Sequence, residues 1–326
     1  DDWAFRLLTL VQMIGALILS LGLPAVFASL EHGGHIDNRT MVGGYVVMRV
    51  PMIVQWLRAA RVDTARRNVC LLYARTIAAA QTGWVILALA PLTRGPSLIL
   101  ALALISVELL GPVLVSRHHG GTPWHPHHIA ERYGLLIIIA LGEGLLGTMA
   151  TLSVLFDASG WSLDLVLVGL AGVALTFGIW WSYFLFPSGD LLHHHRNRSP
   201  LWGNGHIPLI IAVVAIGGGL HLAAYSLDGQ SELGPVPTVL AVAVPVGAYV
   251  VMLYALFGAL TRLLTRHHLW QLAGSAAVVA GSVALVALGG PIWVGLVVLA
   301  AAPWVTVVGQ EIDARRRELA AASTTS

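Results

Sequence analysis

The chain has 326 residues, of which 57% are hydrophobic and 10% are charged. Soluble domains carry about 25% charged residues, so this composition excludes an ordinary soluble protein and predicts a bundle of membrane-spanning helices. The formal net charge is +2, and the basic residues other than histidine are all Arg. The lack of Lys excludes a lysine Schiff base, such as a retinal or pyridoxal phosphate linkage. The one cysteine, Cys70, cannot form an intrachain disulfide.

The predicted elements are ten apolar runs, each close to the roughly 20 residues that a spanning helix needs. We therefore expect an all-α, polytopic membrane bundle. A single transmembrane domain covers residues 1–310 in this interpretation, and residues 311–326 form a short cytoplasmic tail. A tight turn at Gly289, Gly290 and Pro291 separates the last two runs. The predicted spans are 4–30, 41–57, 69–92, 97–116, 129–156, 163–186, 207–227, 238–264, 270–288 and 292–308.

The positions of the arginines predict the orientation of the chain. Arginines cluster in every loop that follows an even-numbered span, whereas the odd loops carry only Arg39 and Arg94 and are otherwise acidic. Short loops rich in positive charge stay in the cytoplasm. Both ends of this chain are therefore expected to be cytoplasmic.

Four ionisable residues fall deep inside predicted spans: Arg49, Arg75, Glu108 and Glu143. Each costs roughly 2.5 to 3.5 kcal/mol at the centre of the bilayer even on a mild insertion scale. We expect at least one of the two arginines to pair with one of the two glutamates. Such a pair either fixes helix register or belongs to an ion relay or polar cavity, and both interpretations stay open.

Helical spacing adds two expectations about these charges. Tyr45, Arg49 and Trp56 share one face of the second span, so the guanidinium is expected to lie in an aromatic environment suited to cation–π contact. Arg132 and Glu143 share a face of the fifth span, about 16 Å apart along the axis, and could mark the mouth and the middle of one polar path. The glycines around Glu143 either allow close helix packing or leave space for a small ligand.

Histidines are concentrated in two segments, RHHGGTPWHPHH and HHHRN, which both fall on the predicted cytoplasmic side. They lack the spacing of a known metal motif, so no metal site and no cofactor are predicted. His206 differs because it is predicted to open a helix, which would fix its orientation.

The segment HHIAERYGLLIIIALGEG resembles the most distinctive motif of the bacterial low temperature requirement protein A family. The segments GYVVMRVPMIVQWLRAAR, VELLGP, WWSYF and NGHIPLI are also similar to that family, in the same order along the chain. The resemblance implies a polytopic inner-membrane protein whose biochemical activity is not established. The matching positions are His128, Glu131, Arg132, Gly142 and Glu143 in the fifth span, and Arg49, Glu108, Trp181, Tyr183 and His206 elsewhere.

Two features depart from the family pattern. Family members usually begin with two further helices, the first of which carries an acidic and aromatic motif, and the opening DDWAFR resembles the segment that follows them. After WWSYF, where the family often has Asp, this chain has Leu185. If a shared site needs those two helices, it would be incomplete in this chain, and the second departure removes or relocates any role of that carboxylate.

These observations predict a secondary transporter or channel-like protein for a small ion or polar solute. Glu108 and Glu143 would accept a proton or cation, with Arg49 as partner and gate. One alternative is a membrane-embedded enzyme that uses the same carboxylates as general acid and base on a lipid-soluble substrate. Another is a membrane scaffold or stress sensor. The expected partners are the lipid bilayer and an unknown small ligand; nucleic acid is not expected, and a homo-oligomer is left open.

Overall fold

The structure is a computed structural model that describes residues 2–32 and 35–324. The described residues are 86% helical and form no strands, which confirms the all-α prediction. Ten helical segments within them are long and apolar enough to cross a membrane, as predicted. Helices suit this environment because each satisfies its own backbone hydrogen bonds where no water is present.

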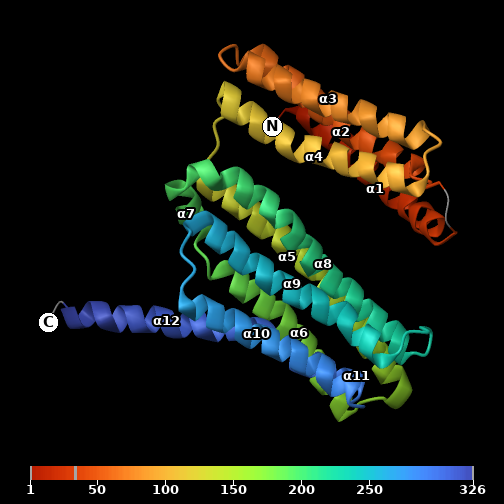
Figure 1. The fold of residues 1–326 in the computed structure, drawn as a ribbon, viewed down its shortest axis with the longest axis vertical. Helices are drawn as coiled ribbons and strands as arrows, with labels where there is room; N and C mark the ends of the chain where they lie inside the picture. The colour runs from red at the N-terminus through yellow and green to blue at the C-terminus, as the bar shows by residue number, and fades with distance from the viewer. Residues whose placement is uncertain (1, 33–34, 325–326) are drawn as a thin grey trace. The chain divides into compact units, whose positions relative to one another are not determined.

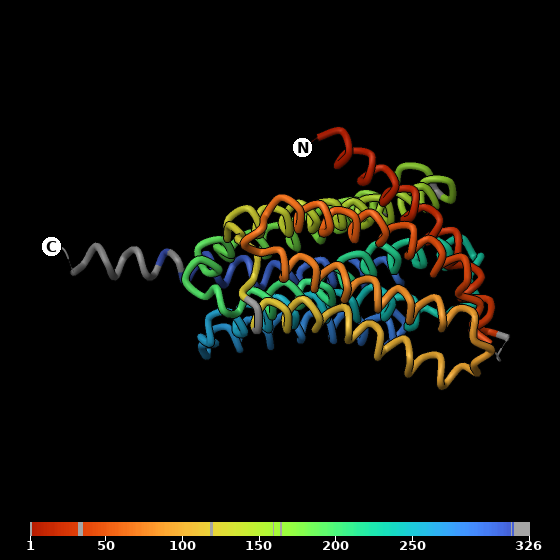
Figure 2. The backbone as a smooth tube through the Cα atoms, turned by 90° about the horizontal axis from the view of Figure 1, so that it is seen from above, coloured from red at the N-terminus to blue at the C-terminus, as the bar shows by residue number. Residues whose placement is uncertain are grey.

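Contacts divide the chain into two compact units, Asp1–Pro123 and Trp124–Ser326. In the first unit, consecutive helices pack on one another and lie side by side along a shared direction (Figures 1 and 2). Two small apolar cores fill it, one around Trp84 and one around Tyr73. The single domain expected over 1–310 stays a prediction. The helices described in this unit are α1 (Trp3–His32), α2 (Arg39–Val62), α3 (Arg67–Leu89) and α4 (Arg94–His119).

The second unit has one large core, centred on the helices that Figure 1 labels α5, α6, α8 and α9. The largest fully buried side chain among its described residues is Tyr249, whose hydroxyl donates to the Ile179 carbonyl oxygen at 2.8 Å. The elements described are α5 (Pro126–Ser159), α6 (Leu163–Phe184), α7 (Ser188–His194), the 3-10 turn η1 (Arg196–Arg198), α8 (Ser199–Leu227), α9 (Pro235–Thr261), α10 (Arg266–Ala287), α11 (Ile292–Leu299) and α12 (Ala302–Thr324).

Glycine and proline mark the boundaries of these helices. Gly160, after α5, has φ +64°, and Gly289, after α10, has φ +97°, a region that favours glycine. The turn expected at Gly289–Pro291 is therefore present. The last predicted span is divided between α11 and α12, with Pro303 in the first turn of α12, where its missing N–H costs little. Helix α12 continues to Thr324 through most of the predicted tail, and residues 325–326 lie outside the described part.

Candidate functional site

A polar cluster occupies the middle of the first unit and joins α2, α3 and α4. The Tyr45 hydroxyl donates to Glu108 Oε2 at 2.6 Å and accepts a hydrogen bond from Arg49 Nη2 at 2.6 Å. Gln81 Nε2 donates to the other carboxylate oxygen, Glu108 Oε1, at 3.0 Å. Arg49 Nη2 lies 4.0 Å from Glu108 Oε2, so the two charges form a loose ion pair bridged by the tyrosine. The pairing expected between an arginine and a glutamate is found here.

The expected aromatic contact is also present, because the Arg49 guanidinium lies 4.9 Å from the centre of the Tyr45 ring. Helical spacing produces this geometry, since residues four apart lie one above the other on the same face. Charge-assisted hydrogen bonds are stronger than neutral ones, and four polar groups sharing them can remain inside an apolar bundle. Within this cluster the sequence identified Arg49, Glu108 and Tyr45 but missed Gln81. Gln81 could have been found from the sequence as a polar amide in an otherwise apolar stretch of α3.

A cavity of about 320 Å³ lies beside this cluster, within the first unit. The side chains of Arg49 and Glu108 are 25% and 16% exposed, and both contribute to its wall. The lining extends from these two residues to Trp56 in α2 and to Thr122, beyond the end of α4. The cavity therefore connects the polar cluster to the end of the unit where α2 and α4 finish. Its other lining residues are Met52, Tyr73, Thr76, Ile77 and Pro112.

Apolar layers lie on both sides of the polar cluster. On one side, the Trp84 ring meets the Tyr45 ring edge-on, with centroids 5.9 Å apart, and packs with Val42 and Leu104. On the other side, the Trp56 and Tyr73 rings stack at 4.5 Å. The order along the three helices is thus apolar, polar, cavity and aromatic. The sequence singled out Trp56, on the face of the second span that it shares with Arg49, but not Trp84 or Tyr73, because aromatic side chains are common in membrane spans.

Arg75 does not join the cluster, although it lies in α3 near the cavity-lining Thr76. Its side chain is exposed, and no hydrogen bond or ion pair is described for it among residues 2–32 and 35–324. Adjacent positions on a helix point in directions about 100° apart, so Thr76 faces the cavity while Arg75 points away from it.

Glu143 lies in the middle of α5, in the second unit, and is exposed. Within the described part of the chain, its carboxylate has no hydrogen-bond or ion-pair partner. The glycines near it have separate explanations. A Cβ on Gly147 would lie 2.6 Å from the Gly217 carbonyl oxygen in α8, so this glycine allows close packing, whereas a Cβ on Gly142 would meet open space.

The fifth-span motif residues upstream of Glu143 lie near the start of α5 and are exposed. His128 Nδ1 is 3.4 Å from Glu131 Oε2, and both side chains are largely exposed, so this pair adds little stability. Arg132 is exposed too and makes no described ion pair within the residues covered by the structure. The exposed motif residues His128, Glu131 and Arg132 therefore lie near the start of α5, and a polar path from them to Glu143 stays a prediction.

His206 belongs to a buried aromatic cluster in the second unit. Its Nδ1 lies 2.8 Å from the Trp202 carbonyl oxygen and its Nε2 lies 3.0 Å from the Tyr183 hydroxyl. Nδ1 must therefore donate, and Nε2 can accept from the tyrosine. The expected fixed orientation is present, but the reason given was wrong: α8 begins at Ser199, so His206 does not open it. Trp181 packs elsewhere, with its ring 5.8 Å from that of Trp304.

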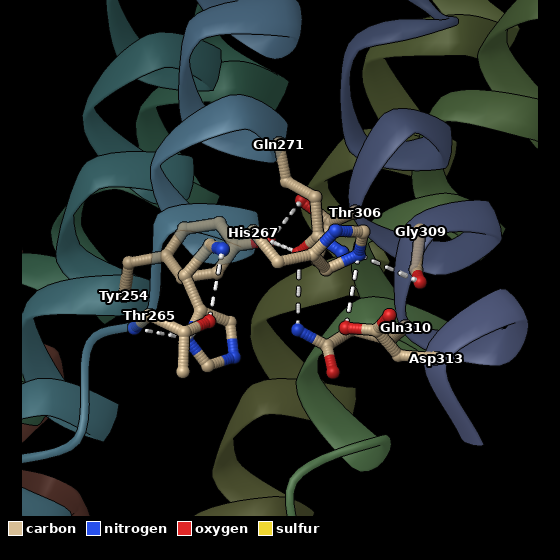
Figure 3. Close-up of polar contacts among 9 residues, drawn as sticks. Tyr254, Thr265, His267, Gln271, Thr306, Gly309, Gln310 and Asp313 are labelled. Carbon is tan, nitrogen blue, oxygen red and sulfur yellow. Dashed lines mark hydrogen bonds and ion pairs between the residues drawn. The ribbon is translucent and has the colours of Figure 1, made fainter. Parts of the chain in front are cut away.

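A second polar network joins α9, α10 and α12 (Figure 3). The Tyr254 hydroxyl donates to Gln271 Oε1 at 2.5 Å, and Gln310 Nε2 donates to the same oxygen at 3.0 Å. His267 Nε2 lies 3.0 Å from Asp313 Oδ2. These contacts hold α12 against α10, and their participants were not identified from the sequence.

The histidine-rich segments show no converging ligands in the part that the structure describes. No group of three or more His, Cys, Asp or Glu side chains there could hold a metal ion. His127 lies 3.6 Å from Asp190, and both are substantially exposed. The side chains of His118 and His119 lie outside the described part. The absence of a metal site stays a prediction.

Comparison with known proteins identifies the family of the chain. No curated protein and no solved structure matched the chain. The profile of the family described as bacterial low temperature requirement A protein (LtrA) matches residues 1–303, which include the polar cluster, the cavity and the α5 motif. The chain therefore belongs to the bacterial low temperature requirement A protein family of multi-pass membrane proteins.

Proposed function

We propose that this protein is a secondary transporter or channel-like protein that moves a small ion or polar solute across the bacterial inner membrane. The observation that supports this most strongly is the layered interior of the first unit. A neutralised Arg49–Glu108 pair lies mid-helix with a cavity on one side and an apolar layer on the other. Ionisable residues inside membrane spans mark substrate and ion pathways more often than they serve packing alone.

Glu108 is the acceptor for a proton or cation in this proposal. Its two oxygens receive hydrogen bonds from Tyr45 and Gln81, which hold the carboxylate in one orientation towards the cavity wall. Arg49 is its charge partner, and the bridging hydroxyl allows the two charges to separate without leaving either one unbonded. The layer around Trp84 closes the path on the side away from the cavity.

Glu143 is the second candidate acceptor for a proton or cation, for a different reason. An exposed carboxylate at mid-helix, without a partner in the described part of the chain, has a high cost in an apolar surrounding. Binding a proton or a cation there would remove that cost. Its contribution is separable from that of Glu108 because the two residues lie in different units.

The test is ion flux into liposomes that contain the purified protein and a pH-sensitive dye, under imposed proton and potassium gradients. Glu108→Gln should reduce flux at least tenfold, because it removes the charge and keeps the size. Arg75→Gln is the matched control: it removes a charge from an exposed position in the same unit and should leave flux unchanged. Glu143→Gln measures the second acceptor. Equal flux in wild type, Glu108→Gln and protein-free liposomes would contradict the proposal.

A membrane-embedded enzyme remains the second candidate, because the cavity lining extends towards one end of the unit. A pocket of that kind suits a substrate that enters and leaves on the same side. A folded preparation without flux, together with a lipid-soluble compound that copurifies with wild type and not with Glu108→Gln, would favour it. The scaffold interpretation predicts a tightly paired Arg and Glu with no cavity beside them, and the cavity argues against it.

A further inference from the structure

The cavity in the first unit has the size and lining of a site for a small solute. Its volume of about 320 Å³ lies at the lower end of the range for ligand pockets, roughly 300 to 1,000 Å³. It would hold on the order of ten water molecules at about 30 Å³ each. This space exceeds what a bare proton or a single metal ion needs.

The arginine in the wall of the cavity has spare hydrogen-bond donors. An arginine side chain carries five N–H donors. One Arg49 donor goes to Tyr45, and another reaches only the weak acceptor Met52 Sδ, at 3.3 Å. Among the described residues, Arg49 Nε is buried and has no hydrogen-bond partner.

Glu108 does not occupy these donors. Each of its oxygens accepts one hydrogen bond, from Tyr45 and Gln81, and the distance of 4.0 Å between Glu108 Oε2 and Arg49 Nη2 is too long for a direct hydrogen bond. The Thr76 hydroxyl also lines the cavity, but its proton is donated to the Leu72 carbonyl oxygen at 2.9 Å. The remaining N–H groups of the Arg49 guanidinium are therefore the charged donors of the lining, and they favour a negatively charged group.

The rest of the lining is apolar and aromatic. Met52 and Ile77 line the cavity beside the charged pair, and Trp56 and Tyr73 form a stacked wall towards its far end. These surfaces would contact the apolar body of a solute whose charged end lies at Arg49. A fully hydrated inorganic anion would gain nothing from them.

We propose that this cavity binds a small organic anion, with a carboxylate on Arg49 and an apolar or aromatic body against Met52, Trp56 and Ile77. The inference rests on the proposed function and names the class of solute for it. A bound carboxylate would place two negative charges and one positive charge at the wall. Uptake of one proton would restore neutrality, which matches the role given to Glu108.

The test compares three probes of nearly equal shape: benzoate, benzamide and benzylammonium. Binding of each radiolabelled probe is measured at pH 7 to the full chain in nanodiscs of zwitterionic lipid, so neither transport nor lipid charge contributes. Benzoate should bind at least tenfold more tightly than benzamide, and benzylammonium should not bind. Arg49→Gln should weaken benzoate binding at least tenfold, and Arg75→Gln should leave it unchanged.

A cavity-filling variant keeps the test decisive if Arg49→Gln fails to fold. Ile77→Trp places a large side chain in the cavity, leaves Arg49 in position and should abolish benzoate binding. Equal binding of the three probes, preference for benzylammonium, or unchanged benzoate binding in both variants would overturn the inference. Ion flux that depends on Glu108 in a protein that fails this test would leave the proposed function intact. Benzoate binding without any flux would overturn the proposed function alone.

Discussion

Tyr45 connects the two buried charges of the first unit, since its hydroxyl contacts both Arg49 and Glu108 while the charges themselves are 4.0 Å apart. The pair therefore depends on a neutral residue. Removing the hydroxyl would leave a guanidinium and a carboxylate without their shared hydrogen-bond partner.

We expect Tyr45→Phe to lower the free energy of unfolding by about 1 to 2 kcal/mol, the scale measured for hydrogen bonds in membrane proteins and for those to charged groups. Tyr73→Phe is the matched control, because the described residues include no hydrogen-bond partner for the Tyr73 hydroxyl although its ring lines the same cavity. Unfolding by SDS in mixed micelles measures both. An equal loss of unfolding free energy in the two variants would show that the hydrogen bonds of the Tyr45 hydroxyl do not stabilise the protein.

The candidate site could be predicted from the sequence only in part. Arg49 and Glu108 were identified from their position deep within an apolar run, because a charged side chain there is costly on any face of the helix. Depth does not tell which face of a helix is buried when the helix is apolar on all sides. For this reason the sequence grouped Glu143 and Arg75 with the buried charges, whereas both are exposed. Gln81 carries no charge, so depth alone gave no signal for it.

At the scale of the elements, glycines set how closely α1 approaches α2. A Cβ on Gly44 would lie 2.2 Å from the Leu19 backbone nitrogen, and one on Gly22 would lie 2.3 Å from that of Met41. Both distances are shorter than any real contact of a Cβ atom. The neighbouring Gly43 is also helical, but a Cβ there would meet nothing within 4 Å. Comparing substitutions at the adjacent residues Gly43 and Gly44 therefore separates the effect of packing from that of helix propensity.

Gly44→Ala should therefore lower the free energy of unfolding by about 1 to 3 kcal/mol, the usual cost of overpacking. Gly43→Ala should raise it by about 0.5 to 1 kcal/mol, because alanine is the better helix former. The same SDS titration compares the two variants. A gain in stability from Gly44→Ala would mean that α1 and α2 are further apart than described.

The turn between α2 and α3 provides a test of pH dependence. Asp63 Oδ1 accepts from the Arg66 backbone N–H and Oδ2 from Arg66 Nη1, both at 3.1 Å. These hydrogen bonds lower the pKa of Asp63 below its usual value of 3.8, and the bond from the Arg66 side chain has the larger effect. A lowered pKa in the folded state means that the carboxylate stabilises the turn above the unfolded-state value and loses that effect as pH falls through the folded value.

We expect the protection of amides 63–67 against hydrogen exchange, corrected for intrinsic rates, to be constant above about pH 5 and to fall below about pH 4. Asp63→Asn should show lower protection at neutral pH and no further fall on acidification. Mass spectrometry of the corresponding peptides measures both. An identical acid dependence in Asp63→Asn would assign the change to another group.

For the whole molecule, the hydropathy of the chain predicted the ten spans, because each must cover the same apolar thickness. It did not predict the short helix α7 or the break between α11 and α12. These irregularities follow Pro187 and precede Pro303, and proline only marks where a helix can end. The division into two compact units also lay beyond the sequence, because it depends on which helices pack together.

The orientation of the molecule remains a prediction from its arginines, and α9 offers a direct test. Ser231 precedes this helix and Leu263 follows it, so a spanning α9 places them on opposite sides of the bilayer. In a Cys70→Ala background, an impermeant maleimide added to intact cells should label Ser231→Cys and not Leu263→Cys, because the arginine-rich loop after α9 stays inside. Labelling of Leu263→Cys after permeabilisation is the control for reactivity. The reverse pattern would invert the topology, and the cavity that ends near Thr122 would then extend towards the outside instead of the cytoplasm.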